Sequence, residues 1–84
     1  MSVIESFVPG DDGQIRRVLS IFAMDTDTDP AERLASRTLS EYARRHNLVI
    51  VANSFRGSES RFQPKTGRRV LVECLVQAKA TVDA

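Results

Sequence analysis

The sequence has 84 residues, of which 42% are hydrophobic and 27% charged, with a formal net charge of +1. This length is typical of one domain, so we expect residues 1–84 to form a single domain. The single cysteine excludes an internal disulfide and a zinc site built from several cysteines. The chain contains neither an apolar run of ~18 residues nor a basic and then apolar leader. These features predict a cytoplasmic protein without a membrane span, and nothing in the composition indicates a cofactor.

The charges are distributed unevenly along the chain. Residues 1–42 carry 8 acidic and 4 basic side chains, whereas residues 43–84 carry 3 acidic and 8 basic ones. Such asymmetry is typical of a surface for a polyanion, or of an acidic face that meets a basic face when two copies associate.

The first part of the chain resembles a β-hairpin. Residues 3–8 have the composition of a short strand, and residues 9–13 are five turn-forming residues in succession. Residues 14–24 then predict a longer second strand, in which apolar side chains occupy both faces beyond Val18.

A helix is predicted after the acidic segment 25–29. Asp29 precedes Pro30, whose fixed φ suits the first helical position, and Glu32 stands where a capping box places its acidic member. Apolar residues then recur at intervals of three and four, with charged residues mostly on the other side. Asn47 is a good candidate for a left-handed residue at the end of the helix. We therefore expect Asp29 to cap a helix that ends near Asn47.

Two further strands are predicted after the helix. Residues 48–55 begin with an apolar, β-branched run, and residues 69–80 alternate between two mostly apolar sets of side chains. Between them, residues 56–68 are polar and contain two glycines and a proline, which predicts a long loop.

The element order β-β-α-β-β indicates an α+β fold. A right-handed crossover through the helix places the second and third strands parallel, and the apolar fourth strand fits between them. The expected four-stranded sheet therefore has the order 1-2-4-3 and mainly antiparallel neighbours. One helix covers only one face of such a sheet. Because the second and fourth strands are apolar on both faces, the uncovered face predicts a homodimer.

The predicted loop and its borders form a basic, partly aromatic segment. Basic side chains interleaved with aromatic rings can hold a phosphate backbone while a ring stacks on a base. The same side chains could bind an acidic protein surface. The last helical turn adds two arginines if it lies near the loop. The candidate contact residues are Arg56, Arg61, Phe62, Lys65, Arg68, Arg69, Arg44 and Arg45.

The acidic segment is a weaker candidate for a metal site. In an extended backbone the carboxylates of Asp25 and Asp27 point to one side, and oxygen clusters of this kind bind Mg²⁺ or Ca²⁺. An EF-hand would need Gly where Pro30 stands and Glu where Ser36 stands. An apolar strand that ends in Asp-x-Asp resembles the nucleophile strand of haloacid-dehalogenase-type phosphatases, but Asp29 stands where that family has Thr or Val. We interpret Asp25 and Asp27 as turn residues, with a metal-dependent phosphodiesterase as an alternative.

The remaining reactive side chains do not form a catalytic group. His46 needs no catalytic role, because a histidine suits the last turn of a helix. Cys74 needs none either, because a cysteine can serve as a small hydrophobic residue in an apolar strand. No acid, base and nucleophile share a spacing that would bring them together. The sequence therefore favours a small non-enzymatic binding or adaptor protein. The main alternative is a protein-interaction module, such as an inhibitor or accessory subunit.

Overall fold

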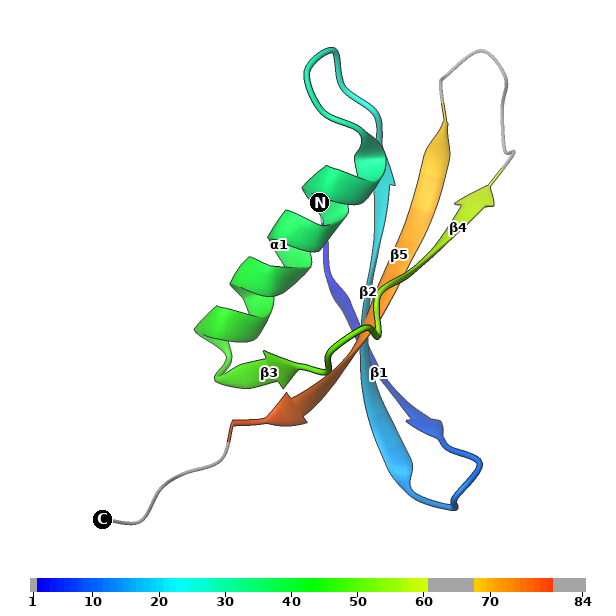
Figure 1. Ribbon diagram of the computed structural model, residues 1–84, viewed down its shortest axis with the longest axis vertical. Helices are drawn as coiled ribbons and strands as arrows, with labels where there is room; N and C mark the ends of the chain where they lie inside the picture. The colour runs from blue at the N-terminus through cyan, green and yellow to red at the C-terminus, as the bar shows by residue number, and fades with distance from the viewer. Residues whose placement is uncertain (1, 61–67, 80–84) are drawn as a thin grey trace.

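The computed structural model of the chain describes residues 2–60 and 68–79. Within them one helix lies on one face of an antiparallel sheet, which confirms the predicted α+β class (Figure 1). The elements are β1 (Ile4–Pro9), β2 (Ile15–Met24), α1 (Ala31–Arg45), β3 (Leu48–Ile50), β4 (Arg56–Ser60) and β5 (Arg69–Ala78).

The predicted hairpin is formed by β1 and β2. Their antiparallel register runs from the pair Ile4↔Ser20 to the pair Pro9↔Ile15. In the turn, the Gly10 N–H donates to the Gln14 carbonyl at 2.7 Å, and Gly13 has a φ of 80°. Glycine suits this position because it adopts a positive φ without steric cost.

The most apolar strand, β5, lies inside the sheet as predicted. It pairs with β2 on one side and with β3 and β4 on the other, and all of these pairs are antiparallel. The predicted order 1-2-4-3 corresponds to the observed path β1-β2-β5-β3. The sheet differs from the prediction in one respect, because β4 is an additional strand that also pairs with β5.

The strands β3 and β4 begin and end at other residues than the sequence predicted. The expected strand over residues 48–55 ends at Ile50, and part of the expected loop over residues 56–68 forms β4. Between the two strands, the Ser54 hydroxyl accepts the Leu75 N–H at 3.1 Å and donates to the Val51 carbonyl at 2.7 Å. The Ser54 side chain thus satisfies a β5 backbone group where the edge strand is interrupted.

The hydrophobic core lies between α1 and one face of the sheet. Alternate residues of β2 and β5, among them Leu19, Ile21 and Cys74, are at most 4% exposed. The helix faces them with Leu39 and with three alanines, Ala31, Ala35 and Ala43. Since side chains of α1 other than Leu39 are small at these positions, the helix can approach the sheet closely.

The predicted helix end is confirmed. The α-helix stops at Arg45, and Asn47 has a φ of 54°, which is the left-handed conformation expected of it. The Asn47 carbonyl accepts the Lys79 N–H at 3.0 Å, so the end of the helix is attached to the chain just after β5.

The opposite face of the sheet carries apolar side chains that no described element covers. Val18, at the middle of β2, is already buried by its neighbours, and Leu71 and Leu75 of β5 are half-buried. Phe22 and Met24 are 40% and 44% exposed. We call this side of the sheet the open face. Along the described parts of the chain, no helix has the length and apolar content needed to cross a membrane.

Candidate binding surfaces

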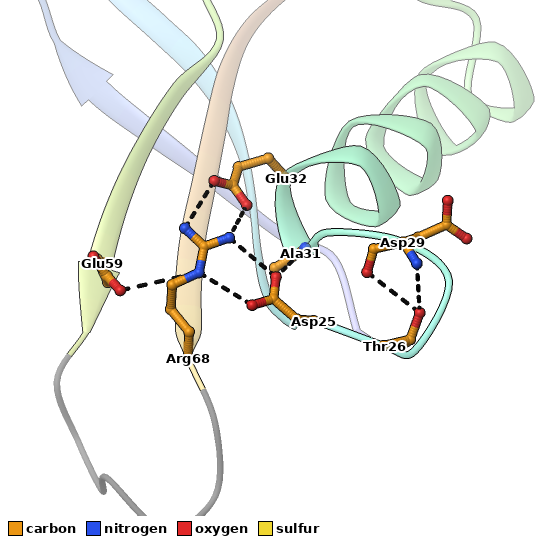
Figure 2. Close-up of polar contacts among 7 residues, drawn as sticks. All are labelled: Asp25, Thr26, Asp29, Ala31, Glu32, Glu59 and Arg68. Carbon is orange, nitrogen blue, oxygen red and sulfur yellow. Dashed lines mark hydrogen bonds and ion pairs between the residues drawn. The ribbon is translucent and has the colours of Figure 1, made fainter.

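The acidic segment before α1 caps the helix with a different residue from the one predicted. Pro30 occupies the N-cap position and makes no side-chain cap, and Asp25 Oδ1 accepts the Ala31 N–H at 2.7 Å (Figure 2). Asp29 lies to one side, where its N–H donates to Thr26 Oγ1 at 3.0 Å. The prediction of Asp29 as the cap is therefore wrong. The segment folds back on itself, so that a residue six positions earlier reaches the first helical N–H.

Arg68 connects the start of β5 to this helix end. Its guanidinium donates to both oxygens of Asp25, at 3.0 and 3.2 Å, and to both oxygens of Glu32 (Figure 2). Glu59 of β4 lies at 4.0 Å from Arg68 Nε. These hydrogen bonds from Arg68 lower the pKa of Asp25 and of Glu32, and the two carboxylates raise the pKa of Arg68. We call Arg68, Asp25 and Glu32 the arginine clamp.

The arginine clamp bears on two predicted sites: Arg68 as a contact for nucleic acid, and Asp25 with Asp27 as ligands of a metal ion. Arg68 uses its guanidinium within the protein, and both carboxylate oxygens of Asp25 already accept hydrogen bonds. Asp27 is exposed in the turn and takes no part in the clamp. In residues 2–60 and 68–79, no three His, Cys, Asp or Glu side chains are grouped so that they could hold a metal ion.

Two of the predicted basic residues lie on the open face. Arg69 stands across from Met24, and its guanidinium carbon lies 4.3 Å from the centre of the Phe22 ring. Arg56 stands across from Glu73 at the edge of the same face. Within the described residues no carboxylate lies within ion-pair distance of Arg56 or Arg69. Both residues are exposed. The predicted contact residues Arg61, Phe62 and Lys65 lie outside the described residues.

Arg44 and Arg45 lie at the other end of the helix. Both contact Glu41, at 3.2 and 3.5 Å, and both are exposed. Arg68 contacts Glu32 in the first turn, so the length of α1, ~22 Å for 15 residues, separates the two groups. The structure therefore does not bring Arg44 and Arg45 together with the basic residues of β4 and β5 (Figure 1).

A polar connection between the hairpin and the last helical turns was not predicted. The Tyr42 hydroxyl donates to Glu5 Oε2 at 3.1 Å, which raises the pKa of Tyr42, and Glu5 also pairs with Arg17. The Tyr42 ring stacks on His46 with 4.1 Å between the ring centres. Because Glu5 and Tyr42 are 37 positions apart, no local sequence pattern indicates the contact.

Cys74 is buried against the helix, as predicted, and this burial raises the pKa of its thiol. A raised pKa leaves the thiol protonated and poorly nucleophilic.

No protein-family profile, no curated protein and no solved structure matches this chain. Its function is therefore inferred from the surfaces described above.

Proposed function

We propose that this protein is a non-enzymatic binding protein that forms a homodimer through the open face and contacts nucleic acid with the basic residues at the border of that face. The observation that carries the proposal is the arrangement of the open face itself. Apolar side chains of β2 and β5, among them Val18, Phe22 and Leu71, lie on either side of the central pair Ser20↔Glu73, and Arg56 and Arg69 lie at the edge and the end of the face. This arrangement resembles an interface with an apolar core and a polar rim.

The size of the open face supports self-association. Strands β2 and β5 have 10 residues each, and with the shorter β1, β3 and β4 they present roughly 500 Å² of sheet, taking ~3.3 Å per residue and ~4.8 Å between strands. Two such faces would bury about 1,000 Å², which is the minimum expected of a biological interface and lies below the ~1,200 Å² at which the range of stable interfaces begins. Phe22, Met24 and Ile4, each at least 40% exposed, would lose most of their contact with water.

The basic border supports contact with a polyanion. Arg56 and Arg69 have no ion-pair partner among the described residues, and the sequence between them adds Arg61 and Lys65. Arginines attract phosphate groups, and the exchange of counterions for such contacts makes the affinity depend on salt. A dimer through the open face would present this set of side chains twice.

Size measurement tests the dimer. Light scattering at micromolar concentration should give twice 9.4 kDa. Phe22→Glu should give a monomer, because it places a charge among the apolar side chains of the proposed interface. Phe7→Glu is the matched control, since Phe7 is exposed on the other side of the sheet. A wild-type monomer, or equal effects of the two variants, would contradict the dimer.

A salt titration tests the nucleic-acid contact. Arg69→Ala and Arg56→Ala should each weaken binding to short DNA or RNA and reduce the salt slope by roughly one unit. Arg44→Ala serves as the control, because Arg44 lies at the far end of α1. If the wild-type protein binds no form of DNA or RNA at low salt, the nucleic-acid function fails, and the same variants then test an acidic protein partner.

A further inference from the structure

The outer edge of β4 is available for pairing. β4 pairs with β5 from Arg56↔Glu73 to Ser60↔Arg69, and no strand of the described chain lies on its other side (Figure 1). Exposed edges are usually protected by proline, bulges or inward-pointing charges. The centre of β4 carries two small residues, Gly57 and Ser58, and its one charged side chain on the helix side, Glu59, lies 4.0 Å from Arg68.

A groove of about 490 Å³ lies beside this edge, between β4 and the first half of α1. Val72 of β5 and Phe55 contribute its apolar lining, and Phe55 is 41% exposed. Arg33 and Ser36 line it from the helix. The volume lies within the range of pockets that bind ligands.

Gly57 leaves the groove open toward the edge. Its register partner is Val72, a core residue, so the missing side chain of Gly57 would point to the helix side of the sheet. A Cβ built at Gly57 meets only Val70 Cγ1, at 3.7 Å, which is an ordinary contact. A large side chain from an added strand can therefore pass over Gly57 toward Phe55 and Val72.

Arg56 indicates which side chain a partner would place beside the groove. Glu32 is held by Arg68, and Arg33 contacts Asp29 at 3.6 Å. Arg56 stands across from Glu73 of β5, yet no described carboxylate lies within ion-pair distance of its guanidinium, so it is the basic side chain at this edge that can still pair. In an antiparallel addition, the residue after the one opposite Gly57 stands opposite Arg56, where an acidic side chain would form a cross-strand pair.

We propose that β4 and this groove bind an extended segment of another protein by strand addition. The segment carries an apolar residue opposite Gly57, which enters the groove, followed by an acidic residue opposite Arg56. Backbone hydrogen bonds along β4 hold the segment, and the two side-chain positions make the binding selective. The proposal shares Arg56 with the proposed nucleic-acid contact, but Gly57 and the groove lie on the helix side of the sheet, so Gly57→Val tests it separately.

Selection from a display library of random seven-residue peptides tests this proposal. The wild-type protein should enrich peptides with an apolar residue followed by Asp or Glu. Fluorescence anisotropy with one enriched peptide then compares two variants. Gly57→Val fills the groove and should weaken binding roughly tenfold or more, which corresponds to loss of one buried apolar side chain. Ser58→Val, the matched control on the open face, should bind as the wild type does.

Both variants place a β-branched residue in a strand, which favours folding, and thermal unfolding checks that each is folded. Absence of a common pattern among the selected peptides, or equal binding by Gly57→Val and wild type, would overturn the proposal. If Gly57→Val converts a dimer to a monomer, the edge is occupied by a second copy, and the peptide proposal is also overturned. That last result would also contradict a dimer through the open face, whereas the other results leave the tests with Phe22→Glu and Arg69→Ala unaffected.

Discussion

Leu39 is the side chain whose removal should cost most, because it is the one large helical residue fully buried against the sheet. After Leu39→Ala, every fully buried residue of α1 would be an alanine. Both ends of α1 are attached, through Asp25 at the start and Asn47 at the end, so the helix cannot move in to fill the cavity. The expected loss is therefore in the upper part of the ~2 to 5 kcal/mol range for buried leucines.

This loss is large for a chain of 84 residues, whose total stability is expected to be roughly 4 to 13 kcal/mol. Urea unfolding at fixed protein concentration measures it. With a slope of ~1 to 1.5 kcal/mol per molar urea, the midpoint should fall by roughly 2 M or more. Leu34→Ala is the control, because Leu34 is only half-buried on the same helix. If the two variants lost the same stability, the inferred position of the core would be wrong.

Three further predictions concern the ends of the helix. Asp25→Ala should lower the thermal midpoint more than Asp29→Ala, since Asp25 accepts the Ala31 N–H; the reverse order would restore Asp29 as the cap. Arg68 lowers the pKa of Asp25 and of Glu32. The clamp therefore stabilises the fold at pH values above the ordinary pKa of these carboxylates. This contribution is lost as the pH falls through their lowered pKa values. Acid unfolding of Arg68→Gln should therefore show a smaller loss of stability between about pH 5 and pH 2 than the wild type, whereas parallel curves would contradict the clamp. Asn47→Gly should leave the urea midpoint nearly unchanged, and Asn47→Val should cost about 1 to 2 kcal/mol because of the positive φ; equal effects would show that this conformation is not required.

Most of the secondary structure was predictable from the sequence because its signals are local. The spacing of apolar residues in α1, the turn residues after β1 and the alternation in β5 depend only on near neighbours in the chain. The same alternation predicted the apolar open face. Asn47 could also be assigned to a left-handed conformation, since this preference belongs to the residue itself.

The strand β4 could not be predicted in this way. Its residues, from Arg56 to Ser60, are polar or small and do not alternate with apolar residues. Pairing with the backbone of β5 makes them a strand, and the paired residues, from Arg56↔Glu73 to Ser60↔Arg69, are not near neighbours in the chain. The sequence of residues 56–60 therefore indicated a loop, whereas pairing with β5 makes them a strand.

The roles of the charged residues were decided by the tertiary structure. Asp25 replaced Asp29 as the cap because the turn folds back toward Ala31. Arg68 and Arg69 are adjacent in sequence, yet one contacts Asp25, 43 positions away, and the other lies over Phe22 on the opposite face. Successive residues of an extended chain point to opposite sides, so the sequence determined that these two arginines would separate. The partners of Arg68 and Arg69 could not be predicted. They depend on the packing of the helix and on the strand register, and these bring together residues that are distant in the chain.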